Sequence, residues 1–170
     1  MLEFDLETTS DDAYLKEYGY SSKDRLDRGI AISRANRDKH VRFSFVNSKT
    51  LRDGENNETL PTNVFDINYE RRLFPTSIGG ELAVTANAHA HFRRSSVDDA
   101  DNIVDGRDVL RLNLDVDWQR QWTLGSGIQA KAQLGVALDT FQVNQDSTFP
   151  DSSSSISPYG VLTFRYPMIR

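Results

Sequence analysis

The chain has 170 residues, 38% of them apolar, and its 20 basic and 25 acidic side chains give a net charge of −5. Its mean hydropathy is −0.55 and no apolar run exceeds three residues, whereas a membrane-spanning helix needs about 20 mostly apolar residues. Helical membrane spans are therefore excluded, but a β-barrel is not, because its strands need not be hydrophobic on average. No basic block dominates the chain, so nucleic acid is not an expected partner.

The start of the chain and its lack of cysteine limit the kinds of site and the cellular compartment that can be expected. With no cysteine, disulfides, thiolate metal sites and cysteine nucleophiles are absent. The opening Met1–Asp5 is acidic where a secretory signal would be basic and then apolar. The chain is therefore expected to be either cytoplasmic or an internal piece of an exported protein.

Alternation of apolar and polar residues predicts about eight β-strands and no helix. The first four are short alternations, and three of the last four are long. In chain order they are Leu2/Phe4/Leu6, Ile30/Ile32, Val41/Phe43/Phe45, Phe65/Ile67/Tyr69, residues 81–93, residues 108–120, residues 127–142 and Leu162/Phe164/Tyr166.

The stretch 110–118 shows why a strand is favoured over a helix. Its leucines, its valine and Trp118 occupy every second position, and Arg111, Asn113 and two aspartates occupy the others. Successive side chains of a strand point to opposite faces, whereas a helix would place neighbours about 100° apart and mix the two sets. The stretches 82–92 and 128–138 alternate in the same way.

The connections between these strands also alternate. Long polar segments are expected at 10–25, 50–61, 94–107 and 144–155, and short ones at 36–38, 74–77 and 124–127. In an antiparallel meander this order places every long loop at one end, as in outer-membrane barrels. The long strands also suit a tilted crossing, which takes about 9–11 residues. The predicted fold is an all-β, antiparallel, up-and-down meander of about eight strands that forms an arc of a large transmembrane β-barrel.

This fold assigns a surface to each set of residues. Residues expected to face lipid are Leu82, Val84, Ala86, Leu110, Leu112, Leu114, Val116, Ile128, Leu134, Val136 and Leu138. Polar residues expected to face a water-filled lumen are His89, His91, Arg111, Asn113, Asp115, Asp117, Lys131 and Gln133. Aromatic residues expected at the membrane interfaces are Trp118, Trp122, Tyr69 and Tyr166.

Four stretches resemble the outer-membrane barrel of the LptD family of lipopolysaccharide-assembly proteins, particularly its alphaproteobacterial forms. In chain order they are Asp12–Tyr18 with Asp24–Leu26, Leu60–Pro61 leading to Ile67–Arg71, Gly106–Leu112 leading to Trp118–Leu124, and Pro158–Arg170. Together these stretches span nearly the whole chain.

The resemblance implies a protein larger than this chain. Such proteins have a periplasmic jellyroll and a barrel of about two dozen strands that encloses a plug lipoprotein, and they pass lipopolysaccharide from a periplasmic bridge to the outer leaflet. Residues 1–170 would then be an early-to-middle part of that barrel, without the jellyroll and the closing strands. The implied setting is the outer membrane of a Gram-negative bacterium, the implied partners are lipopolysaccharide, the bilayer, the plug and the bridge, and no enzymatic activity or cofactor is expected.

Three clusters suggest other chemistry. His89 and His91 share a strand face at a spacing that can bind metal, but polar lining of a lumen is the favoured interpretation. Asp115 and Asp117, with Glu81 as a possible neighbour, could form an acid–base pair, but pairing with Arg111, Lys131 or Arg93 is favoured. The acidic segment 98–102 resembles part of a calcium loop without its glycine and distal glutamate. A solvated outer loop is the favoured interpretation, with weak cation association as the alternative.

Two alternatives to the barrel-fragment hypothesis stay open. One is a self-contained eight-stranded outer-membrane barrel that binds, adheres or modifies lipid. The other is a soluble lipid-binding β-barrel or sandwich, in which the apolar rows would pack against a second layer of the same chain.

Overall fold

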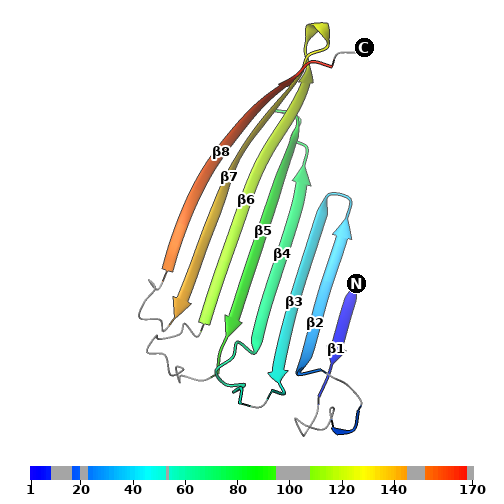
Figure 1. Ribbon diagram of the computed structural model, residues 1–170. Coiled ribbons are helices and arrows are strands. Elements are labelled where there is room, and N and C mark those ends of the chain that lie inside the picture. Colours follow the sequence, from blue (N-terminus) through cyan, green and yellow to red (C-terminus); the bar gives the residue numbers. More distant parts are fainter. Residues whose placement is uncertain (9–16, 20–22, 53, 95–107, 145–151, 168–170) are drawn as a thin grey trace.

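A computed structural model describes residues 1–8, 17–19, 23–52, 54–94, 108–144 and 152–167. It contains one eight-stranded antiparallel sheet in which every strand pairs with its sequence neighbours, in the order β1 to β8 (Figure 1). The strands are β1 (Leu2–Leu6), β2 (Arg25–Asn36), β3 (Lys39–Thr50), β4 (Asn63–Leu73), β5 (Glu81–Phe92), β6 (Asp108–Thr123), β7 (Gln129–Asn144) and β8 (Ser152–Arg165), with a short 3-10 turn at Gly125–Gly127. The prediction of an all-β, up-and-down meander is confirmed.

The strands are long. Seven of them, β2 to β8, have 11 to 16 residues, whereas strands of water-soluble proteins usually have about 5–6. Only β1, with 5 residues, is short. Two residues predicted to belong to strands lie just outside them: Ile128 precedes β7 and Tyr166 follows β8.

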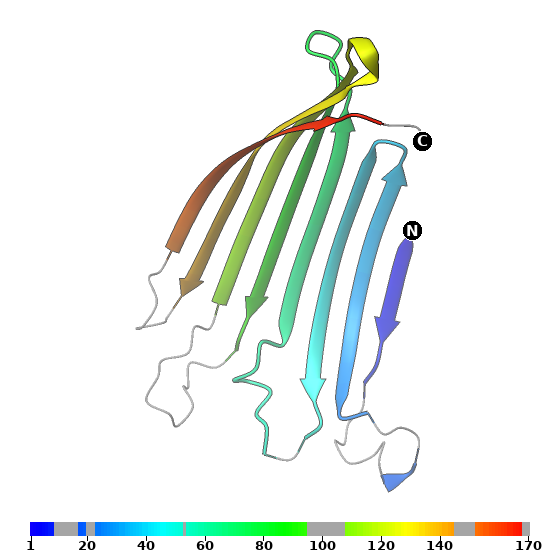
Figure 2. The same cartoon turned by 45° about the horizontal axis from the view of Figure 1, so that its top comes forward.

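The sheet is a single curved layer (Figure 2). In the described part of the chain, the extensive contacts between elements join only strands that are adjacent in sequence, so no second layer packs on either face. Buried side chains are accordingly few among these residues: Leu26, Thr50, Leu51, Thr62 and Ala130. The sandwich alternative, which needed a second layer, is not supported.

The connections lie at two ends of the sheet, as predicted (Figure 1). Residues 37–38, 74–80 and 124–128 connect strands at one end, here called the turn end, and residues 7–24, 51–62, 93–107 and 145–151 connect them at the other, here called the loop end. The predicted contrast in length is wrong for the last connection, since 145–151 is no longer than 74–80.

The length prediction failed because Ser152–Ser155 belong to β8 and not to a loop. These serines pair with the end of β7, from Asp139 to Gln142, and the hydroxyl groups of Thr140 and Ser154 lie 2.9 Å apart. Cross-strand hydrogen bonding by the backbone and by hydroxyl pairs therefore extends the strand through a segment whose composition is typical of a loop. Among the described residues, no helix is long and apolar enough to cross a bilayer.

Candidate functional site

Strand pairing carries one apolar face across the sheet. The row through the middle of β6 illustrates it, since Tyr69, Ala86, Leu114, Leu138 and Ile156 stand opposite one another in succession from β4 to β8. The other predicted lipid-facing residues of the strands join this face: Leu82, Val84, Leu110, Leu112, Val116, Leu134 and Val136. Val41, Phe43 and Phe45 of β3, with Ile30 and Ile32 of β2, extend it toward β1.

This apolar face is open. Leu134 is 56% exposed, Leu162 63% and Phe164 62%. Soluble monomers rarely expose contiguous apolar patches larger than a few hundred Å2, and here the patch runs over eight strands. The sheet therefore presents a contiguous, exposed apolar surface.

Aromatic residues lie toward both ends of the apolar face. Phe45, Phe65 and Phe92 form a chain of ring contacts near the loop end, with centroid separations of 4.6 and 5.9 Å. Near the turn end, the Trp118 and Trp122 rings lie 6.4 Å apart and Trp118 Nε1 donates to Gly79 O at 2.8 Å. Amphipathic rings favour the two interfaces of a bilayer because one part of each ring is apolar and another is polar.

Basic side chains accompany these turn-end aromatics. Arg120 lies over the Trp122 ring at 5.2 Å and donates from its guanidinium to Ile78 O at 2.6 Å. Lys39 lies 5.5 Å from the centre of the Tyr69 ring. Tyr166 follows the turn end of β8. All four predicted interfacial aromatics therefore lie in the turn-end half of their hairpins.

The opposite face, here called the polar face, carries linked hydrogen bonds across strands. His89 Nδ1 lies 2.7 Å from Asp66 Oδ1 on β4, and His89 Nε2 lies 3.3 Å from His91 Nδ1. One row further, Asn68 Nδ2 donates to Asn87 Oδ1 at 2.7 Å. These pairs satisfy polar groups between strands and leave the face wettable.

A second polar cluster involves β6, β7 and β8. Gln133 donates to Asp117 at 2.9 Å, and the Tyr159 hydroxyl donates to Asp117 at 3.3 Å and to Asp115 at 3.4 Å. Tyr159 reaches both carboxylates because it stands opposite Gly135, whose missing side chain leaves room for the ring. The two aspartates therefore bind neutral donors on neighbouring strands.

The predicted partners of these aspartates are corrected on one point. Arg111 does not pair with Asp115 or Asp117. Its guanidinium instead forms a bidentate pair with Asp139, at 3.1 and 2.6 Å. The pairing register explains this choice, since Arg111 stands diagonal to Asp139 on β7 and a guanidinium fork matches a carboxylate. Lys131 lies on the polar face near the turn end, opposite Gln121 and Thr163. Glu81 stands opposite Gln119, diagonal to Asp117.

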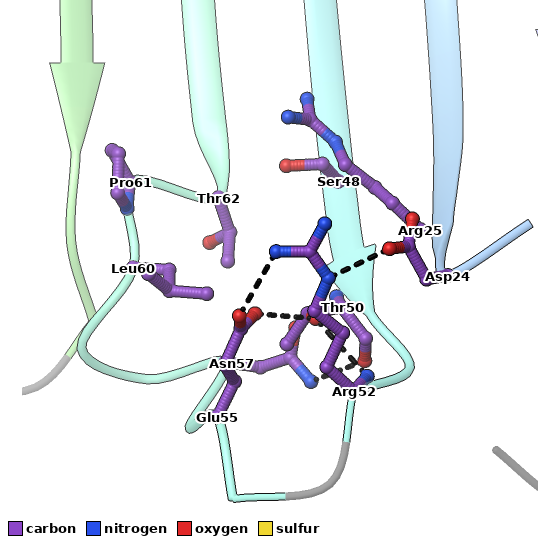
Figure 3. Close-up of a pocket in the computed structure, with 10 residues that line it drawn as sticks. All are labelled: Asp24, Arg25, Ser48, Thr50, Arg52, Glu55, Asn57, Leu60, Pro61 and Thr62. Carbon is purple, nitrogen blue, oxygen red and sulfur yellow. Dashed lines mark hydrogen bonds and ion pairs between the residues drawn. The ribbon is translucent and has the colours of Figure 1, made fainter.

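A cavity of about 400 Å3 lies at the loop end between β2, β3 and the 51–62 loop (Figure 3). Arg52 is held at its mouth by Asp24 at 2.7 Å and by Glu55 at 3.2 Å. Asn57 closes the loop through two bonds with the backbone of Thr50, at 2.6 and 3.1 Å. The loop is therefore built as a defined structure on top of the sheet.

Hydrogen bonds around Arg52 stabilise the charged forms of Arg52 and Glu55. Hydrogen bonds from the Thr50 hydroxyl and from Arg52 lower the pKa of Glu55, with the Thr50 bond the larger cause. Hydrogen bonds to Asp24 and Glu55 raise the pKa of Arg52. Both groups are thus held in their charged forms, and two carboxylates balance the cations that line this cavity.

Two of the stretches that carry the family resemblance meet at this cavity. Asp24 and Arg25 line one side of it, Leu60 and Pro61 line another, and Leu26 beside them is 3% exposed. A sequence model of the LptD family, described as LPS transport system D, matches residues 1–170. The chain belongs to the LptD family.

The family match confirms the resemblance seen in the sequence, and membership supports a role in lipopolysaccharide transport. LptD proteins are outer-membrane transport proteins with a β-barrel, which agrees with the all-β sheet found here. No curated protein and no solved structure matches the chain.

Other predicted sites of this LptD-family chain have separate outcomes. His89 and His91 are brought together with Asp66, but among the described residues no group of three or more potential ligands is placed to hold a metal ion. The acidic segment 98–102 lies outside the described residues. Sequence reasoning missed the Arg52 cluster, whose only local signal was the pair of resembling stretches beside it.

Proposed function

We propose that residues 1–170 form an arc of the barrel of an outer-membrane translocon that assembles lipopolysaccharide into the outer leaflet without chemical change. The apolar face contacts lipid tails, and the polar face lines a water-filled lumen. The observation that carries this proposal is the single open sheet with one apolar face over eight strands in a chain of the LptD family.

The physics of a bilayer supports this division of surfaces. Backbone donors and acceptors inside hydrocarbon must be satisfied within the protein, and pairing from β1 to β8 satisfies those between the strands. On the other side, Asp66 with His89 and Arg111 with Asp139 are polar pairs that need water or a polar ligand nearby. A water-filled lumen that admits a glycan would provide these polar groups with such surroundings.

The open edges support a partial barrel. In the described chain, β1 pairs only with β2 and β8 only with β7, so each presents an unpaired edge. A closed eight-stranded barrel would require β1 to pair with β8. Further strands on both edges would remove this aggregation hazard, and residues 1–170 are then the early-to-middle part of a larger barrel.

The partners follow from the same proposal. Lipopolysaccharide and the bilayer contact the arc directly. A plug lipoprotein would face the polar wall, and periplasmic bridge proteins would deliver substrate through a part of the protein outside this chain.

Depletion of the full-length protein in its native host tests the function. Newly made lipopolysaccharide should disappear from the cell surface and accumulate in the inner membrane, because its route to the outer leaflet is lost. Surface antibody binding and membrane fractionation measure its location, and mass spectrometry measures its lipid A. Unchanged surface lipopolysaccharide would contradict the transport role, whereas an altered lipid A mass would contradict the non-enzymatic role.

Cysteine labelling tests the orientation, and the absence of cysteine from these 170 residues makes the experiment direct. Asn56→Cys in the 51–62 loop should react with a membrane-impermeant maleimide in intact cells, because the loop end faces outward. Thr76→Cys in the 74–80 turn should react only after the outer membrane is permeabilised. The reverse pattern would invert the proposed orientation, and the unsubstituted protein supplies the background.

A further inference from the structure

A second cavity at the loop end is basic. It measures about 180 Å3, and three cationic side chains line it, Arg28 of β2, Lys49 of β3 and Arg94 after β5, together with one carboxylate, Glu58. The larger cavity beside it is balanced, since Asp24 and Glu55 oppose Arg25 and Arg52. An excess of positive charge is therefore concentrated at one side of the 51–62 loop.

The strand register places two of the basic residues, Arg28 and Lys49, on the side of the apolar face. Arg28 stands opposite Asn47, one row beyond the pair of Ile30 and Phe45. Lys49 lies two residues beyond Asn47 on β3, and Arg94 lies two residues beyond Phe92. Arg28 and Lys49 therefore continue the apolar-face rows toward the loop end, and Arg94, which follows β5, lines the cavity with them.

The lining is held in place by neighbouring groups. Arg28 donates from Nε to Glu7 O and from Nη2 to Thr8 Oγ1, each at 3.1 Å. Asn47 Nδ2 donates to Asn63 Oδ1 at 2.8 Å and to Thr62 O at 3.3 Å. Such contacts restrict the side chains before a ligand arrives, which reduces the entropy cost of binding.

Aromatic rings continue from the cavity into the apolar face. Phe92 stands opposite Asn63, in the same row as Arg28 and Asn47. Phe65 lies in the next row and contacts the rings of both Phe45 and Phe92. A ligand bound by the cations would thus place an attached apolar part on these three rings, so the site suits an anion that carries hydrocarbon chains.

We propose that this cavity binds the phosphorylated headgroup of an outer-leaflet glycolipid, with its acyl chains on Phe45, Phe65 and Phe92. Arg28, Lys49 and Arg94 neutralise the phosphate, since guanidinium and ammonium groups bind phosphate oxygens by charge-assisted hydrogen bonds. The inference rests on the proposed function for its orientation, because the loop end must lie at the outer leaflet. It adds a docking point on the outside of the barrel wall, where lipid that has left the lumen is held.

Binding to the purified full-length protein in detergent tests the site. The probes are bis-phosphorylated lipid A, the same lipid with its phosphates removed, and inorganic phosphate, and bound lipid is counted by native mass spectrometry during titration. The triple variant Arg28→Gln/Lys49→Gln/Arg94→Gln should bind phosphorylated lipid A at least about tenfold more weakly, which corresponds to about 1.4 kcal/mol. Arg94→Gln alone, at an exposed side chain, should lose part of this affinity without a folding defect.

The matched control removes the same charge from the other end of the same face. Arg34, Lys39 and Arg71 lie in the apolar-face rows near the turn end, and the variant Arg34→Gln/Lys39→Gln/Arg71→Gln should keep its affinity for lipid A. Equal weakening by both triple variants would overturn the proposal in favour of general electrostatic attraction. Equal binding of dephosphorylated lipid, or tight binding of inorganic phosphate alone, would also overturn it.

The test of this cavity can fail independently of the test of the proposed function. The cavity is tested by lipid binding in vitro, whereas transport is tested by the location of lipopolysaccharide in depleted cells. If depletion abolishes surface lipopolysaccharide but the loop-end triple variant binds lipid A normally, the docking site is wrong and the transport function stands. If depletion has no effect, the transport function fails whatever the binding result.

Discussion

Replacing Leu114 with arginine is expected to destabilise the membrane-embedded barrel by about 2–4 kcal/mol. Leu114 lies in the middle of β6 on the apolar face, opposite Ala86 and Leu138. A guanidinium there would have to enter hydrocarbon, and neither Ala86 nor Leu138 has a polar group that could pair with it. The amount of folded full-length protein in the outer membrane, measured by its heat-modifiable mobility in gels, should fall sharply.

The adjacent residue supplies the matched control. Asn113 lies on the polar face opposite Asn87 and Asp139, so an arginine there would meet water and a carboxylate. Asn113→Arg should therefore assemble nearly as well as the unsubstituted protein. Equal assembly of the two variants, or a larger loss for Asn113→Arg, would show that the lipid-facing and lumen-facing sides are assigned wrongly.

Replacing Gly80 with valine is expected to cost about 1–3 kcal/mol from backbone strain alone, with a steric cost in addition. Gly80 has a φ of +82° in the turn between β4 and β5, a conformation that β-branched residues rarely adopt. A Cβ at this position would lie 2.3 Å from the carbonyl oxygen of Gln119 on β6. The turn would have to move away from β6, which would also strain the bond from Trp118 to Gly79.

Urea titration of the full-length barrel in lipid vesicles measures this loss, and another turn-end glycine controls for it. A Cβ added at Gly125 would meet no atom within 4 Å, so Gly125→Val should have a much smaller effect. If the two valine variants lose equal stability, neither the positive φ of Gly80 nor the close packing of the 74–80 turn against β6 is the cause.

The alternation of residue types was enough to predict the strands and their two faces. In β5, β6 and β7, each side chain is assigned by its position parity, because successive residues of a strand point to opposite sides. That rule is local and needs no knowledge of the partner strand. It also placed the short early strands from as few as two apolar residues, such as Ile30 and Ile32.

The same local rule failed where pairing overrides composition. Ser152–Ser155 are typical of a loop, yet they extend β8 because the end of β7 offers them backbone partners. The pairing of Arg111 with Asp139 likewise depends on the register between β6 and β7, which fixes which charges come within reach. Neither result can be obtained from one strand alone.

The sequence by itself determined that this chain forms long two-faced strands, because side-chain alternation is a property of each strand. It also carried the motifs that mark the LptD family. Only the tertiary structure decided which polar groups meet, as with Tyr159 and the two β6 aspartates, and how the 51–62 loop gathers Asp24, Arg52 and Glu55. Apart from the local bond between Arg52 and Glu55, these contacts join residues far apart in the chain, so they exist only once strand register and loop path are fixed.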